Sequence, residues 1–373
     1  MLRFLDAGES HGKALMAIID GVPSNVEIDV DFINNELIRR QRGYGRGKRM
    51  QIEKDRVEIW SGIRETKTTG NPITMIIFNK DYENWNKVLN GNTGKNERIT
   101  IPRPGHGDMV GYFKYKTGDI RNVIERTSAR ETAIRTAVGA LCKCILGSIG
   151  VDIRSKVMNI GGIEDDNVDL FDNEAYLRIE NSSVRCYNEH VENMIKYEID
   201  KCKQQGDTVG GSIFISVKGV PLGIGSYIQW DRKLDAILSY ALMSVQGIKA
   251  IEFGKGTDLA KRGTTFNDEI LCNKGDIIRP TNNCGGIEAG VSNGQNIEIT
   301  AYMKPIPTIK KSIRSVDLKD NYNVVNRYER SDVCGVVPAS IVLENVCAFE
   351  ILKEILNTYP ADDIVTLKKY IEK

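Results

Sequence analysis

Residues 121–150, RNVIERTSARETAIRTAVGALCKCILGSIG, predict a long buried helix around which the rest of the chain packs. Ser128 and Glu131 fit a capping box, in which each side chain satisfies a free backbone N–H at the helix start. The residues before Ser128 are predicted to form a polar loop. After it, apolar residues recur three and four positions apart, and small residues extend the apolar surface beyond one face. The apolar positions are Ala133, Ile134, Ala137, Val138, Leu141, Cys144, Ile145 and Ile149.

The start of this helix is also a candidate anion site. Free N–H groups and the helix dipole favour negative charge there. Arg121, Arg126 and Arg130 surround that end in the sequence. An ordinary core helix with surface arginines accounts for the same residues, so both interpretations stay open on this stretch alone.

The composition is that of an ordinary globular protein. The chain has 373 residues, is 41% hydrophobic and 27% charged, and has a net charge of +1. This length allows one large domain or two smaller ones. No stretch approaches the roughly 20 apolar residues of a membrane helix, and the N-terminus does not read as a secretory signal. The near-neutral balance means that any anion recognition comes from local clusters.

The cysteines and histidines do not form a metal-binding pattern. There are eight cysteines and three histidines, and no C-x-x-C occurs. A zinc site of the usual spacing is therefore not expected, and we predict no metal. Most cysteines lie in apolar or helical patterns, which favours reduced thiols in a cytoplasmic protein.

Two of the three histidines lie in glycine-rich polar loops, His11 in GESHG and His106 in RPGHGD. Glycine allows the backbone to come close to a ligand. A single loop histidine is weak evidence, and a plain loop residue explains His11 taken alone. His190 precedes an amphipathic helix and is interpreted as structural or exposed.

Residues 39–49 form a basic, glycine-rich segment with no acid before Glu53. A solvated basic surface is one explanation. RNA binding is a second, because such cations with Tyr44 can grip phosphates and stack bases. A small polyanionic ligand fits a neutral chain better, since arginine binds phosphate and carboxylate through a bidentate fork. The cations are Arg39, Arg40, Arg42, Arg46, Lys48 and Arg49.

Periodicity elsewhere predicts both strands and helices. Alternation indicates strands near 14–19, 70–78, 213–217 and 297–303, and helical spacing appears near 32–38, 191–202, 234–242 and 341–351. Polar loops are expected over 81–98, 254–268 and 311–328. No G-x-G-x-x-G follows a strand and no Walker A motif is complete, which disfavours Rossmann and P-loop enzymes.

A faint internal repeat is visible. Gly-Val-Pro occurs at 21–23 and at 219–221, each time after an apolar strand and before helical periodicity. The repeat predicts two similar halves, about 1–200 and 201–373, packed as a single unit.

Eight motifs, taken together, resemble the chorismate synthase family, and the similarity covers nearly the whole chain. Each motif is weak alone, but eight in the right order are highly specific. They are GESHG at 8–12, RRQRGYGRGKRMQIEKD at 39–55, RPGHGD at 103–108, RTSARETA at 126–133, GSYIQWDRKLDA at 225–236, TNNCGGIEAG at 281–290, MKPIPT at 303–308 and ERSD at 329–332.

The resemblance implies a fold and a reaction. The fold would be α+β, a β-α-β sandwich with a central helical layer between antiparallel sheets and an internal pseudo-twofold, assembled as a homotetramer. The reaction would be the 1,4-anti elimination of phosphate from 5-enolpyruvylshikimate 3-phosphate to give chorismate, requiring reduced FMN without net redox change. Since the matched region leaves no room for a reductase domain, we expect an external flavin reductase or other source of reduced FMN. NADPH-driven turnover by the pure protein would contradict this.

The resemblance also implies roles for single residues. His11 would protonate the departing phosphate, His106 would donate a proton near the flavin, and Asp332 would lie close to flavin N5. The substrate anions would be bound by Arg40, Arg46, Arg49, Arg103 and Arg130. The FMN contacts would be Arg126, Thr127, Ser128, Gln246, Gly247, Ala289, Gly290, Lys304, Pro305, Ile306, Pro307, Thr308 and Arg330.

Two alternatives stay open at this point. An FMN-dependent oxidoreductase using the same pocket would show net oxidation or reduction of its substrate. An RNA-binding protein using the basic segment would lose affinity steeply with salt, but it leaves His11, His106 and Asp332 without a role.

Overall fold

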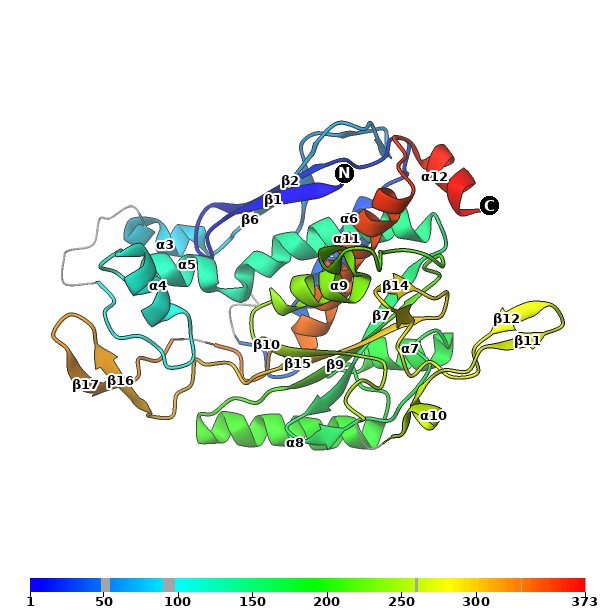
Figure 1. Ribbon diagram of the computed structural model, residues 1–373. Helices are drawn as coiled ribbons and strands as arrows, with labels where there is room; N and C mark the ends of the chain where they lie inside the picture. Colours follow the sequence, from blue (N-terminus) through cyan, green and yellow to red (C-terminus); the bar gives the residue numbers. More distant parts are fainter. Residues whose placement is uncertain (48–53, 90–97, 259–260, 330, 373) are drawn as a thin grey trace.

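The computed structural model describes residues 1–47, 54–89, 98–258, 261–329 and 331–372, and it mixes helices with antiparallel sheets (Figure 1). The first sheet has the strand order β1-β2-β6-β3. On β2, Leu15, Ala17 and Ile19 are buried, whereas Met16 and Ile18 are exposed, as alternation in a half-buried strand requires. The strands are β1 (Arg3–Gly8), β2 (Ala14–Asp20), β6 (Ile73–Phe78) and β3 (Glu58–Ile59).

The second sheet has five antiparallel strands in the order β10-β15-β9-β7-β8. Its middle strand β9 pairs Ile215 with Ile299 of β15 on one side and with Ser155 of β7 on the other. The predicted strands near 213–217 and 297–303 are confirmed. The bounds are β10 (Ile248–Phe253), β15 (Ile297–Met303), β9 (Gly211–Lys218), β7 (Asp152–Ile160) and β8 (Ile163–Glu164).

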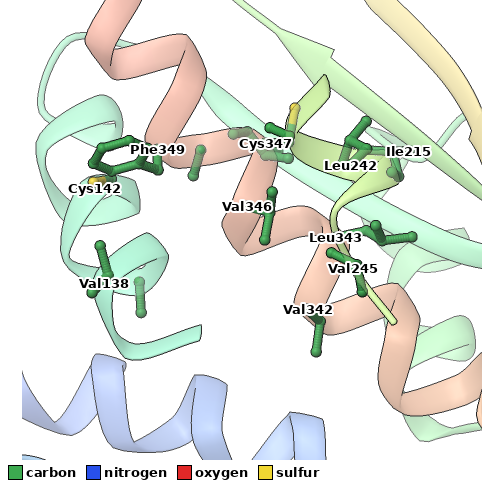
Figure 2. Packing of buried hydrophobic residues seen from close by; sticks show 14 of the residues in the cluster. Val138, Cys142, Ile215, Leu242, Val245, Val342, Leu343, Val346, Cys347 and Phe349 are labelled. Carbon is green, nitrogen blue, oxygen red and sulfur yellow. The ribbon is translucent and has the colours of Figure 1, made fainter. Parts of the chain in front are cut away.

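The helix predicted from residues 121–150 is confirmed as α6 (Thr132–Gly147), and it packs against β2 and β6 of the first sheet. The long helix α11 (Val336–Thr358) packs against α6 and against β7 and β9 of the second sheet. Helices α1 (Val30–Gln41) and α9 (Leu234–Met243) also contact α11. Figure 2 shows this core, where the labelled side chains are Val138, Cys142, Ile215, Leu242, Val245, Val342, Leu343, Val346, Cys347 and Phe349.

Gly139 lies where α6 comes closest to α11. A Cβ atom at this position would lie 2.1 Å from the backbone oxygen of Asn345, closer than atoms can approach. The small residues of the 121–150 stretch therefore let the two helix backbones touch.

Four predicted loops contain regular structure instead, and one of them, 254–268, holds the short helix α10 (Gly263–Phe266). Residues 121–127 form helix α5 (Arg121–Thr127), and part of 81–98 forms α3 (Tyr82–Leu89). Within 311–328, β16 (Arg314–Asp317) and β17 (Tyr322–Val325) pair as a hairpin. These elements are short and polar, so their sequences carry little periodicity.

The remaining elements lie around this core. Among the described helices, none is long and apolar enough to cross a membrane. The other helices are α4 (Asp108–Tyr115), η2 (Ala129–Glu131), α7 (Asn173–Asn181), α8 (Glu189–Gln205), η3 (Trp230–Arg232), α10 (Gly263–Phe266) and α12 (Ile364–Ile371). The other strands are β4 (Ile63–Arg64), β5 (Lys67–Thr68), β11 (Leu271–Asn273), β12 (Asp276–Ile278), β13 (Ile287–Glu288) and β14 (Val291–Ser292).

Candidate active site

His11 lies in the turn between β1 and β2 and is held by Glu125 of α5. Its Nδ1 lies 2.8 Å from Glu125 Oε1, and its backbone N–H donates to Oε2 at 2.7 Å. The His11 ring also lies against Trp85 of α3, with 4.1 Å between ring centroids and 32° between the ring planes. Burial would raise the pKa of the Glu125 carboxyl, but the hydrogen bonds from His11 outweigh it and lower that pKa. Sequence reasoning identified His11 but neither of these two partners.

Two predicted substrate arginines, Arg40 and Arg130, both contact Asp55 in the interior of the protein. Arg130 Nη1 lies 2.6 Å from Asp55 Oδ2, and Arg40 Nη1 lies 3.6 Å from the same oxygen. Both arginines are at most 5% exposed. Burial, partly offset by Asp55, lowers the pKa of Arg40 to about 10, so it stays cationic at neutral pH. With two cations and one carboxylate, this cluster has net positive charge in a buried place.

Asn79 joins this cluster to the His11 loop. Its Oδ1 accepts from Arg130 Nη2 at 2.7 Å, and its Nδ2 donates to the backbone oxygen of Gly12 at 2.7 Å. Arg40 Nη1 is buried and makes no hydrogen bond within the described part of the chain. A buried cation with an unused donor can bind an additional anion.

The predicted capping box does not form. Ser128 Oγ accepts from the backbone N–H of Arg130, and it also accepts from Ser10 Oγ at 3.1 Å. Because α5 precedes it, the Ser128 N–H already donates to Ile124 O. Glu131 instead accepts from Gln246 Nε2 at 2.7 Å.

His106 lies in a second polar cluster at the start of α4. Its Nδ1 lies 2.5 Å from Asp108 Oδ1, and Arg103 Nε donates to Asp108 Oδ2 at 2.8 Å. Burial would raise the pKa of Asp108, but these contacts with His106 and Arg103 hold it well below its usual range. Arg103 also donates to Thr308 Oγ1 at 3.1 Å and pairs with Glu329 at 3.3 Å, so its guanidinium is engaged within the protein.

Several of the predicted cofactor residues lie around the His106 loop. Lys304 Nζ donates to Gly105 O at 2.5 Å, and its backbone N–H donates to Gly247 O at 2.9 Å. A Cβ atom on Gly105 would lie 3.5 Å from Pro307, and one on Gly107 would lie 3.0 Å from Thr127. Arg103, from the same loop, donates a hydrogen bond to Thr308 Oγ1. The backbone oxygen of Ile306 accepts from Thr208 Oγ1.

Other predicted residues lie apart from this group. Arg126 pairs with Asp6 at 2.8 Å and lines a cavity of about 640 Å³ that His11, His106 and Asp332 do not line. Ala289 and Gly290 form the turn between β13 and β14, where Gly290 O accepts from Leu234 N at the start of α9. Gln246 and Gly247 follow the other end of α9, but Gly247 O connects them to the His106 group through the backbone N–H of Lys304. Arg49 and Arg330 lie outside the described residues.

Asp332 binds the basic segment at two points. It accepts from Arg46 Nη1 and from the backbone N–H of Gly47, both at 2.6 Å. Arg39 points into a different, buried ion cluster, where it contacts Glu36 at 2.6 Å and Glu344 at 2.9 Å. The interpretation of residues 39–49 as a solvated basic surface is therefore wrong for Arg39, Arg40 and Arg46.

This arrangement fits acid–base chemistry on an anionic ligand. Two histidines are each bound through Nδ1 to a buried carboxylate, which is how proteins orient a proton-transferring imidazole. Buried arginines lie beside one of them. Within the described ranges, no group of three or more histidine, cysteine or acidic side chains could hold a metal ion.

The fold carries two histidine–carboxylate pairs, and buried arginines are joined through Asn79 to the loop of one of them. A model of the chorismate synthase family matches residues 2–356. A chorismate synthase from Clostridium tetani is 67% identical over 371 residues, covering 100% of this chain and 96% of its own. One from Alkaliphilus metalliredigens is 49% identical over 374 residues, covering 99% and 98%. A crystal structure of chorismate synthase superposes with a TM-score of 0.80 at 36% identity, covering 100% of this chain and 96% of its own. The chain belongs to the chorismate synthase family, and it is a lyase.

Proposed function

We propose that this chain converts 5-enolpyruvylshikimate 3-phosphate to chorismate and phosphate by 1,4-anti elimination. The C–O bond to phosphate breaks and leaves its electron pair on the phosphate oxygen. A ring C–H bond also breaks; its proton is finally lost to solvent, and its electron pair supplies the new ring double bond. The observation that carries the proposal is the buried Arg40–Asp55–Arg130 cluster joined through Asn79 to the loop of His11. This cluster supplies the cations that would bind a phosphate or carboxylate group of the substrate, and the proton donor His11 lies in the neighbouring loop.

Each catalytic residue has a defined part in this proposal. His11 protonates the departing phosphate, which is otherwise a poor leaving group. Arg40 and Arg130 hold an anionic group of the substrate, and Arg46, Arg49 and Arg103 complete the anion-binding set. His106 holds a proton on the opposite side of the site, with Asp108 fixing its ring. Asp332 orients Arg46 and lies at the cofactor side.

We also propose that the site binds reduced FMN. The residues around His106 fit a flavin, because Gln246 Oε1 is a buried acceptor that has no hydrogen-bond partner in the described ranges. Thr127, Ser128, Gly247 and the segment 304–308 would line this place, and Arg126, Ala289, Gly290 and Arg330 would extend it. When bound, reduced FMN supplies transient electron density during C–O cleavage without net redox change.

The two alternative functions have less support. An FMN-dependent oxidoreductase would need net electron transfer to its substrate, whereas the family to which the chain belongs consists of lyases. RNA binding would need the basic segment at the surface, but Arg40 is 5% exposed and Arg39 is bound in an interior ion cluster. We therefore propose no nucleic-acid partner.

The whole molecule is proposed as one α+β domain, a β-α-β sandwich whose two halves are related by a pseudo-twofold. Gly21 and Gly219 support this, because both repeated Gly-Val-Pro motifs begin with a glycine near φ +85°. A homotetramer is supported by the outer face of the first sheet, which exposes Leu5, Met16 and Ile18. We propose a cytoplasmic location without membrane attachment, which eight free thiols support, and an external source of reduced flavin.

The deciding experiment is an anaerobic assay with 5-enolpyruvylshikimate 3-phosphate and chemically reduced FMN. Chorismate and phosphate are expected in equal amounts, and oxidised FMN is expected to give neither. Net reduction or oxidation of the substrate would favour the oxidoreductase instead. A folded, flavin-binding protein that releases no phosphate would rule out the elimination.

A further inference from the structure

Glu125 is a buried carboxylate that contacts both the ring and the backbone N–H of His11. Its Oε1 lies 2.8 Å from the ring Nδ1, and its Oε2 accepts from the backbone N–H of the same residue at 2.7 Å. Glu125 is 4% exposed, so little water competes for either oxygen. Trp85 covers one face of the ring, and the Arg121 guanidinium lies 5.1 Å from the Trp85 ring centroid. The imidazole is thus fixed both at its edge and at its face.

These contacts determine which ring nitrogen carries which proton. Burial opposes ionisation of Glu125, but the hydrogen bonds from His11 and the positive charges of His11 and Arg121 lower its pKa. Glu125 is therefore an ionised carboxylate that can only accept hydrogen bonds. Nδ1 must therefore donate, so it keeps its proton whether the ring is charged or neutral. The proton that His11 can release is the one on Nε2.

We propose that Glu125 is the positioning residue for His11, holding the Nδ1–H tautomer so that the Nε2 proton reaches the leaving phosphate. This rests on the proposed role of His11. When the C–O bond breaks, the phosphate oxygen takes the electron pair and then the Nε2 proton. The imidazolium becomes a neutral imidazole whose remaining proton, on Nδ1, stays bound to Glu125.

Glu125→Gln tests this because an amide has only one acceptor oxygen. The buried backbone N–H of His11 cannot move, so the amide oxygen is expected to remain on it. The amide NH₂ then faces Nδ1, which must accept, and the neutral ring carries its proton on Nε2. Release of that proton would leave an imidazolate, so the ring can no longer act as an acid. Glu354→Gln is the matched control, since Glu354 of α11 is also a buried carboxyl, 5% exposed, and outside the site.

The tautomer can be measured in the resting protein. The chain has only three histidines, so ¹⁵N-histidine NMR with His106→Ala and His190→Ala variants identifies the His11 signals. At alkaline pH, the native protein and Glu354→Gln are expected to show His11 protonated at Nδ1, and Glu125→Gln to show it protonated at Nε2. A native His11 protonated at Nε2 would overturn the proposal, even if the Glu125 variant does not fold.

Single-turnover phosphate release supplies the second readout. Glu125→Gln is expected to slow it about 10²-fold or more, the lower range for loss of a general acid. The double variant His11→Ala/Glu125→Gln is expected to be no slower than His11→Ala, because both changes remove one function. Losses that multiply would contradict the positioning role. If the native enzyme releases no phosphate, the proposed elimination reaction is wrong. The NMR measurement would still show whether Glu125 determines the tautomer of His11.

Discussion

At the scale of single residues, the two histidines share one arrangement built from different parts of the chain. His106 is bound to Asp108, two positions away at the start of α4, whereas His11 is bound to Glu125 across a separation of 114 positions. The His106 pair can thus form within one short segment. The His11 pair exists only when the β1–β2 turn docks against α5, so its function depends on tertiary structure.

His106→Ala is expected to keep the fold and flavin binding but to lower the elimination rate by about 10²–10⁴-fold, the usual contribution of general acid catalysis. The fold is expected to survive because Asp108 keeps its ion pair with Arg103 at 2.8 Å. Stopped-flow turnover and flavin titration measure the two effects separately. His190→Ala, a change at the exposed start of α8, serves as the control. An unchanged rate would remove His106 from the mechanism.

The sequence identified the site's motifs but not the partners that hold them. Glu125, Asn79 and Trp85 stand in no recognisable pattern with His11 or Arg130, because their contacts join distant segments. Asp55 lies in the same motif as Arg40, but the motif does not indicate that Asp55 pairs with Arg130. The basic segment is a second example. Arg39 and Arg40 look alike in sequence, but neighbouring helical residues point about 100° apart. Arg39 therefore enters the ion cluster of Glu36 and Glu344, whereas Arg40 lies beside Asp55 and Thr132.

At the scale of elements, the strongest periodicities gave correct predictions. The sequence predicts α6 correctly because its buried residues recur at helical spacing over about four turns. The same holds for α11. Helix α5 has only seven residues, and its burial comes from a small cluster of Ile99, Ile120 and Ile124 that is assembled by tertiary contacts. A seven-residue helix is marginal without such packing.

The contact between α6 and α11 predicts opposite effects for the same substitution at two positions of one helix. Gly139→Ala places a Cβ 2.1 Å from the Asn345 backbone oxygen, which forces the helices apart and is expected to destabilise the protein by about 1–3 kcal/mol or more. Gly147→Ala meets nothing within 4 Å and is expected to stabilise by about 0.5–1 kcal/mol through helix propensity. Urea unfolding measures both. Equal effects at the two positions would contradict this close approach.

At the scale of the whole molecule, one buried ion cluster ties several elements together. Glu344 of α11 contacts Arg39 of α1 at 2.9 Å, Lys143 of α6 at 2.9 Å and Arg185 at 3.2 Å. Glu36 and Glu180 complete the cluster, giving three acids and three bases. Removing one member would leave an unpaired buried charge, which is strongly destabilising.

This cluster makes the free energy of unfolding depend on pH. Burial would raise the pKa of Glu180, but Arg185 and Arg39 lower it to about 2, and the pKa of Glu344 is also lowered. Because an unfolded glutamate titrates near about 4.3, the stabilisation is complete above that pH and is lost as pH falls towards the folded values. Urea unfolding between pH 3 and 7, roughly the window spanned by these pKa values, is expected to show this decline.

Glu344→Gln is expected to lower the free energy of unfolding by about 3–5 kcal/mol at neutral pH, because three cations then face two carboxylates. The variant is also expected to lose less stability than the native protein as the pH falls. Glu174→Gln, at an exposed position of α7, is the control and is expected to change neither. An acid slope that is identical in the native protein and Glu344→Gln would assign the decline to other carboxylates.

The pairing of α6 with α11 also sets the order of events during protein synthesis. About 190 residues separate the end of α6 from the start of α11. At about 5–20 residues per second, a ribosome takes roughly 10–40 s to make them. For that time the face of α6 that carries Val138 and Cys142 lacks its partner helix (Figure 2). The nascent chain therefore exposes an apolar surface for a time in which chaperones can bind. The helices α6 and α11 can pack together only after α11 has left the ribosome.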